Sequence, residues 1–183
     1  MIGRCGCLLL CILLNQRCVP ARFCLLSYDT HHGFQTDSTV LRAVHLNPFN
    51  ALLYTTDVSG EKQKIEAGRF WGYQDHRGNK YRIYGGDIYE VIQVKTMTIY
   101  RQSNYGGRFN DDYYFSVGPN ESIYYLNLTQ LKRAFNHDPC MLDLVKKMPV
   151  RNWFKTDANN TFLLLEAYGY CQQQTGREPL TTP

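Results

Sequence analysis

The sequence predicts an α+β fold, in which an antiparallel, tyrosine-rich β-meander is followed by two or three C-terminal helices. Short segments rich in tyrosine and β-branched residues, separated by turns with glycine, asparagine and proline, continue as far as residue 126. Helix-start signals and apolar residues at helical spacing follow from residue 127 onwards. A run of strands followed by a run of helices is typical of the α+β class.

The N-terminal residues predict a secretory signal peptide. Arg4 supplies a positive charge, residues 7–14 form an unbroken apolar run, and Val19-Pro20-Ala21 has the small or β-branched residues of a cleavage site. Eight apolar residues are too few to span a bilayer. We expect a signal peptide (1–21), a single α+β domain (22–176, mostly β over 22–126 and mostly helical over 127–173) and a flexible tail (177–183).

The β part of the domain is expected to contain a series of short strands. Residues 22–35 leave two alternatives open, a first strand or the continuation of a longer leader. Gly85-Gly86 suits a two-residue hairpin, because both central positions of that tight turn need a positive φ. A loop rich in glycine and asparagine is expected over 103–110. The expected strands are 39–46, 51–56, 62–67, 70–73, 80–84, 88–94, 96–102, 113–117 and 122–126.

The C-terminal part carries three helix-start signals. Asn127 with Gln130 three residues later matches a capping box, and Asp138-Pro139 places a cap before a proline at the first helical position. Asp157 is a candidate cap for a third helix that extends to Gln173. For residues 161–165 a strand is the alternative.

Size and charge exclude some classes of function. The chain has 20 basic and 16 acidic residues, and loss of the leader would remove two of the basic ones. Such a small excess does not favour nucleic-acid binding, which requires a clustered basic surface. No other apolar run approaches the length of a membrane helix. We therefore expect neither a nucleic-acid partner nor a transmembrane segment after signal removal.

The cysteines leave two questions open. Cys18 and Cys24 are each a candidate for the acylated first residue of a lipoprotein, although Arg17 and Phe23 stand where a small residue is preferred. In an oxidising compartment, Cys140 and Cys171 can form a disulfide between two C-terminal helices. Two buried free thiols are the alternative.

One region resembles a known group of proteins. The motif Phe70-Trp-Gly-Tyr-x-Asp-x-x-Gly-x-x-Tyr-Arg-x-Tyr84 is followed by Ile123-Tyr-Tyr-Leu126 and then by Leu128-x-x-Leu-Lys-x-Ala-Phe135. Over about 70–148 the chain is similar to small, functionally uncharacterised exported proteins typical of the Bacteroidetes. The resemblance implies a periplasmic, outer-membrane-associated or secreted location. It implies no activity, cofactor or catalytic residue.

The sequence contains little that indicates a catalytic or metal-binding site. The segment Asp75-x-x-Gly78-Asn79 resembles a calcium loop in composition only and suits a hairpin turn. No zinc-ligand spacing, nucleophile elbow or phosphate-binding loop is present. A hydrolase would need Cys140 with His137, or convergence of the carboxylates of Glu90, Glu121 and Glu166. We assign no catalytic residue, metal or cofactor.

The densest candidate site is aromatic. Tyrosine buries an apolar ring but keeps a polar tip, which suits contact with a protein or a glycan. Alternation divides the strand tyrosines between two faces, and cross-strand pairing that only stabilises the sheet is the alternative interpretation. The candidate partner-binding residues are Trp71, Tyr73, Arg82, Tyr84, Tyr100 and Arg101, together with the loop Ser103–Asp112.

The sequence therefore predicts an exported, non-catalytic protein that binds a protein or glycan of the cell envelope through an aromatic sheet face. A small hydrolase that acts on envelope polymers is one alternative. A periplasmic inhibitor or chaperone-like module is another, and it would need an unpaired strand edge for a partner to extend.

Overall fold

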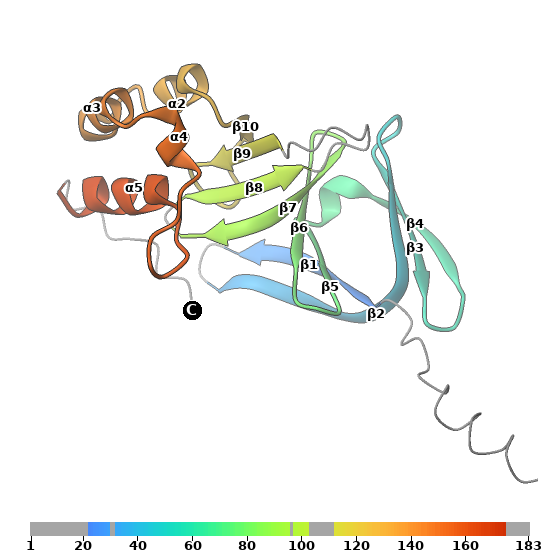
Figure 1. Ribbon diagram of the computed structural model, residues 1–183. Helices are drawn as coiled ribbons and strands as arrows, with labels where there is room; N and C mark the ends of the chain where they lie inside the picture. Colours follow the sequence, from blue (N-terminus) through green and yellow to red (C-terminus); the bar gives the residue numbers. More distant parts are fainter. Residues whose placement is uncertain (1–21, 30–31, 96, 103–111, 175–183) are drawn as a thin grey trace, which may run out of the picture.

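The computed structural model describes residues 22–29, 32–95, 97–102 and 112–174 (Figure 1). The expected signal peptide and C-terminal tail lie outside the described residues. So does the loop expected over Ser103–Asp112, apart from its last residue.

The described residues form a single antiparallel sheet with the strand order β10-β9-β8-β7-β6-β5-β1-β2-β3-β4. Its strands are β1 (Phe23–Asp29), β2 (Gly33–Asn47), β3 (Leu52–Asp57), β4 (Lys62–Glu66), β5 (Gly72–Asp75), β6 (Lys80–Tyr84), β7 (Asp87–Val94), β8 (Thr98–Gln102), β9 (Asp112–Ser116) and β10 (Tyr124–Tyr125). A 3₁₀ turn, η1 (Ala67–Arg69), precedes β5.

The sheet consists of two meanders. Strands β5 to β10 follow one another in space as in sequence, and so do β1 to β4. The two meanders are joined between β5 and β1 instead of between β5 and β4, so a single continuous meander is not formed. The join pairs residues about fifty positions apart, and local sequence patterns carry no signal for such a pairing.

The N-terminal strand occupies the middle of the sheet. β1 pairs with β2 on one side and β5 on the other, so the first of the two alternatives for residues 22–35 holds. Leu25 and Leu26 point to opposite faces, and both are buried. The ring of Phe23 packs edge-on against Tyr73. Acylation at Cys24 would require removal of this ring, because the acylated cysteine begins the mature chain.

Four α-helices follow the sheet: α2 (Leu128–Ala134), α3 (Pro139–Lys147), α4 (Val150–Trp153) and α5 (Leu163–Gln174). Two expected caps are confirmed: the Asn127 side chain accepts from the backbone N–H of Gln130, and that of Asp138 from Met141. The third helix begins later than expected, at Leu163, because Asp157 closes a turn instead. The single-turn α4 was not expected.

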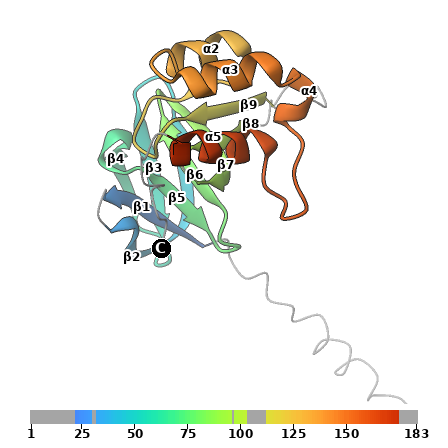
Figure 2. The same ribbon diagram turned by 90° about the vertical axis from the view of Figure 1, so that its left-hand side faces the viewer.

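The helices gather over β8 and β9, at one end of the sheet (Figure 2). Ile99 and Phe115 on the covered face pack with Leu131, Met141 and Trp153 in the largest buried cluster. Of two smaller clusters, one contains Leu25 and Leu53, and the other contains Leu26 and Tyr100 on the opposite face of the sheet. Within the described part of the chain, none of the helices has the length and apolar character that crossing a membrane requires.

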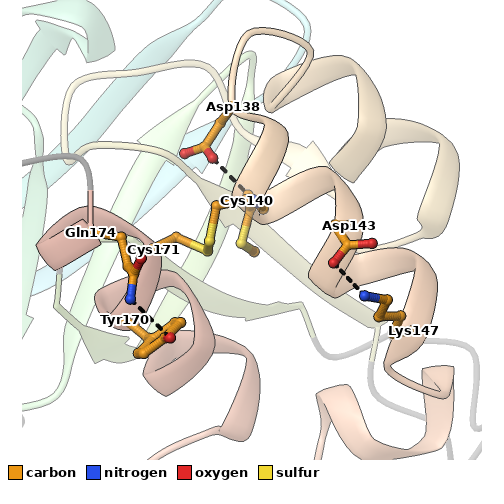
Figure 3. Close-up of a disulfide and its surroundings, with 8 residues drawn as sticks. Asp138, Cys140, Asp143, Lys147, Tyr170, Cys171 and Gln174 are labelled. Carbon is orange, nitrogen blue, oxygen red and sulfur yellow. Dashed lines mark hydrogen bonds and ion pairs between the residues drawn. A yellow bond between two sulfur atoms is a disulfide. The ribbon is translucent and has the colours of Figure 1, made fainter.

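A disulfide between Cys140 and Cys171 ties α3 to α5 (Figure 3). Their Cα atoms lie 5.6 Å apart, and the bond closes a segment with a sequence separation of 31. Cys171 is fully buried in the helical cluster. The remaining described cysteine, Cys24, carries a free thiol.

Candidate functional site

The six candidate partner-binding residues divide between the two faces of the sheet. Arg82 lies opposite Gly72 and Tyr89 in the strand register. Its guanidinium lies 5.1–5.7 Å from the ring centres of three candidates on the same face, namely Trp71, Tyr84 and Tyr100. Tyr73 and Arg101 point to the other face, so the six residues do not form one surface.

Arg82 is the centre of a buried polar cluster. Its Nη1 donates to the hydroxyl of Tyr100 at 2.8 Å, and its Nη2 donates to the backbone carbonyl of Glu121 at 2.7 Å. The indole N–H of Trp71 donates to the carbonyl of Pro119 at 2.8 Å. Both carbonyls belong to the segment between β9 and β10, which these bonds hold over the sheet.

The burial of this cluster corrects part of the predicted site. Trp71, Arg82 and Tyr100 are 8%, 4% and 0% exposed, so they cannot touch a partner on the folded protein. They stabilise the fold, as the alternative interpretation of aromatic pairing proposed. Tyr73, Tyr84 and Arg101 remain partly exposed.

The opposite face contains a concave hollow with a volume of about 850 Å³. One wall is the end of β2 with the following turn, and the other is formed by β5 to β8. The side chains that matter for its chemistry are Tyr73, Tyr81, Glu90 and Arg101. Volumes of this size are typical of small-molecule sites.

Two stacked tyrosines line the hollow. The rings of Tyr73 and Tyr81 lie 4.9 Å apart at 18°, because the two residues are directly paired between β5 and β6. The Tyr81 hydroxyl donates to a carboxylate oxygen of Asp75 at 3.4 Å. Burial raises the pKa of Tyr81, and the negative charges of Asp75 and Glu90 raise it further. The hydroxyl therefore stays protonated and able to donate at neutral pH.

An ion pair stands beside the stacked rings. Arg101 Nε and Nη2 both contact Glu90 Oε2, at 2.9 and 2.6 Å. The two residues face each other across β7 and β8, and Tyr81 is the neighbour of Glu90 on β6. Both side chains keep part of their surface exposed. The hollow thus presents donors and acceptors next to aromatic rings.

The shape of the hollow depends on contacts that the sequence pattern does not show. The turn at Gly85-Gly86 approaches the end of β2, and a Cβ at Gly86 would lie 3.4 Å from the carbonyl oxygen of Pro48. The register shifts in β1–β2 and β2–β3 mark bulges, which bend strands. From the sequence, Tyr81 was not assigned to the binding site and Glu90 was considered only as a hydrolase carboxylate, although strand alternation places both residues on the face of Tyr73.

The hydrolase candidates do not converge. Cys140 is bonded to Cys171 and cannot act as a nucleophile with His137. Glu90 lines the hollow, whereas Glu121 lies in the segment over Arg82 and Glu166 on α5 pairs with Lys95 at 2.7 Å. Among the described residues, no three histidine, cysteine or acidic side chains gather into a metal-binding group.

The calcium-like segment is a turn. One carboxylate oxygen of Asp75 accepts the backbone N–H groups of Arg77 and Asn79 at 2.8 and 2.9 Å, and the other accepts from the Asn79 amide. Gly78 has a φ of 86°, a conformation that favours glycine. These bonds account for both oxygens and agree with the hairpin turn expected from the sequence.

The chain matches no known protein-family model, no curated protein and no solved structure. What the protein does is therefore inferred from its own geometry.

Proposed function

We propose that the protein is an exported, non-catalytic binding protein whose ligand is a glycan of the cell envelope, held in the hollow. The observation that carries this proposal is the stack of Tyr73 on Tyr81 beside the Glu90–Arg101 ion pair, in a concave site. Sugar rings present apolar C–H faces and a rim of hydroxyls. Aromatic rings next to paired charged groups match both features.

The concave shape favours a glycan over a flat protein surface. Small ligands are enclosed by clefts of a few hundred Å³, whereas protein interfaces spread over a broader and flatter area. The leader-like N-terminus and the resemblance to exported proteins support the proposed location. The disulfide supports it too, because such bonds persist mainly in oxidising compartments.

An inhibitor or chaperone-like module that works by strand addition has less support. β4 forms one edge of the sheet and carries Lys62, Lys64 and Glu66. Charged side chains on an edge strand oppose pairing with another chain. The other edge, β10, is only two residues long.

Glycan binding is tested with a panel of envelope oligosaccharides, followed by calorimetry with the tightest binder. We expect Tyr81→Ala and Arg101→Gln each to weaken binding about tenfold, the loss of about 1.4 kcal/mol. Tyr170→Ala changes the same residue type and Lys147→Gln removes a cation from another ion pair, both at exposed helical positions, and both variants should bind like the wild type.

The outcomes of this experiment are distinct. Absence of glycan binding, or full affinity in both hollow variants, would rule the proposal out. Cleavage of the bound glycan would show the hydrolase alternative instead. Location is tested separately by the intact mass of the native chain, which should begin at Arg22 and not at Met1.

A further inference from the structure

A second surface lies on the sheet face opposite the hollow, over β6, β7, β9 and β10. The register places Tyr84 opposite Asp87, and Tyr114 opposite Tyr125. Tyr89 lies on the same face, in the buried cluster with Trp71 and Tyr100. We call this surface the tyrosine patch and define it as Tyr84, Asp87, Asp112, Tyr114 and Tyr125, with the buried Tyr89 packed against Tyr114.

The rings of the tyrosine patch stand nearly perpendicular to one another. Tyr89 and Tyr114 have ring centres 5.0 Å apart at 71°, and Tyr114 and Tyr125 have ring centres 5.3 Å apart at 87°. Tyr125 is 46% exposed, and its hydroxyl donates to Asp112 Oδ1 at 3.2 Å. Asp87 is exposed at the start of β7. Aromatic rings and carboxylates are therefore accessible together.

The patch carries two carboxylates, those of Asp87 and Asp112. Burial, and after it the charge of Asp87, raise the pKa of Tyr89 to about 12. Burial and the charge of Asp112 raise the pKa of Tyr114 in the same way, and for Tyr125 the charge of Asp112 is the main cause. Asp87 and Asp112 thus place negative charge near these hydroxyls, although the chain as a whole has a net charge of +4.

The same face of the sheet already holds cations against aromatic rings. Lys80 Nζ lies 4.8 Å from the ring centre of Phe34, and the Arg82 guanidinium lies 5.1 Å from that of Tyr84. Attraction between a cation and an aromatic face is worth about 0.5–1 kcal/mol at exposed sites. Cationic side chains of a partner could contact the exposed parts of the tyrosine rings together with the carboxylates of Asp87 and Asp112 in the same way.

We propose that the tyrosine patch docks a basic segment of a partner protein, with lysine or arginine side chains against the tyrosine rings and near Asp87 and Asp112. Tyrosine is enriched in protein interfaces, and complementary charge fixes the orientation of the partner. Because the net charge of the chain repels a basic peptide, binding of such a peptide would report this local surface. The proposal does not depend on glycan binding in the hollow.

The test uses a fluorescein-labelled decapeptide of alternating lysine and glycine, and a glutamate–glycine peptide of the same length. Fluorescence anisotropy is measured at low ionic strength, where charge attraction is least screened. We expect the lysine peptide to bind and the glutamate peptide not to. The double variant Asp87→Asn/Asp112→Asn and the variant Tyr114→Ala should each weaken binding by about fivefold, which corresponds to about 1 kcal/mol.

Two controls separate docking from general charge and from unfolding. Glu61→Gln removes one negative charge on the exposed turn before β4 and should leave binding unchanged. Urea unfolding shows whether Tyr114→Ala is folded, and the Asp87→Asn/Asp112→Asn variant provides the test without loss of a ring. Absence of lysine-peptide binding, equal binding of the glutamate peptide, or an equal loss in Glu61→Gln would overturn the proposal.

Discussion

Arg82 is a buried cation that the fold stabilises without a carboxylate in the described part of the chain. A buried charge is costly unless it is hydrogen-bonded and compensated. Here the compensation comes from the Tyr100 hydroxyl, the Glu121 carbonyl and three aromatic rings. Arginine suits this role because its planar guanidinium donates in several directions and stacks on rings.

Position 72 requires glycine, because the paired strand leaves no room for a side chain. A Cβ at this position would lie 1.9 Å from the carbonyl oxygen of Tyr81, which is backbone of the paired strand. We therefore expect Gly72→Ala to lower the free energy of unfolding by about 3 kcal/mol, since overpacking forces the strands apart. Gly68→Ala, where nothing lies within 4 Å, should change it much less. Urea unfolding of both variants would contradict this view if the two losses were equal.

The same five-residue turn occurs at three places among the residues that the structure describes. In each turn the first residue is an aspartate, whose carboxylate accepts the backbone N–H groups of the third and fifth residues. The fourth residue has a positive φ. The turns begin at Asp57, Asp75 and Asp157. Two of them place glycine at position four, and the third places Asn160 there with a φ of 59°. Asparagine tolerates this conformation better than most other residues.

The turn at Asp57 makes a prediction about pH. The Ser59 hydroxyl, which donates at 2.6 Å, is the main reason that the pKa of Asp57 lies below its ordinary value of 3.8. Stability from this carboxylate is therefore present above the ordinary pKa and is lost as the pH falls through the lowered one. We expect Ser59→Ala to raise the pKa of Asp57, measured by NMR titration, and to leave that of Asp75 unchanged. An unchanged Asp57 pKa would refute the assignment.

Local signals predicted the elements better than the site. The caps at Asn127 and Asp138 and the turn at Gly85-Gly86 depend on residues a few positions apart, so the sequence contains the whole cause. The hollow depends on the bend of β2 and on the approach of Gly86 to Pro48, which are far apart in sequence. Alternation predicted that the tyrosines divide between two faces. Which rings are buried depends on where the helices and the segment before β10 lie.

At the scale of the whole molecule, the disulfide holds the helical layer together. Closing a segment of this length is expected to stabilise the fold by about 3–4 kcal/mol, mainly by restricting the unfolded chain. We expect the Cys140→Ser/Cys171→Ser variant to lose that amount in urea unfolding, and a reducing agent to have the same effect on the wild type. Cys24→Ser should not respond in this way. Equal stability of the oxidised and reduced wild type would contradict the prediction.

The position of β1 also sets the order in which the molecule can be assembled. During synthesis the strand emerges first, but one of its two edges has no partner until β5 follows about fifty residues later. Until β5 is synthesised, Leu25 and Leu26 stay exposed, and the backbone N–H and C=O groups on that edge of β1 have no partner strand. A nascent chain of this topology has to be kept apart from its neighbours, and its folding is slow because the decisive pairing closes a long loop.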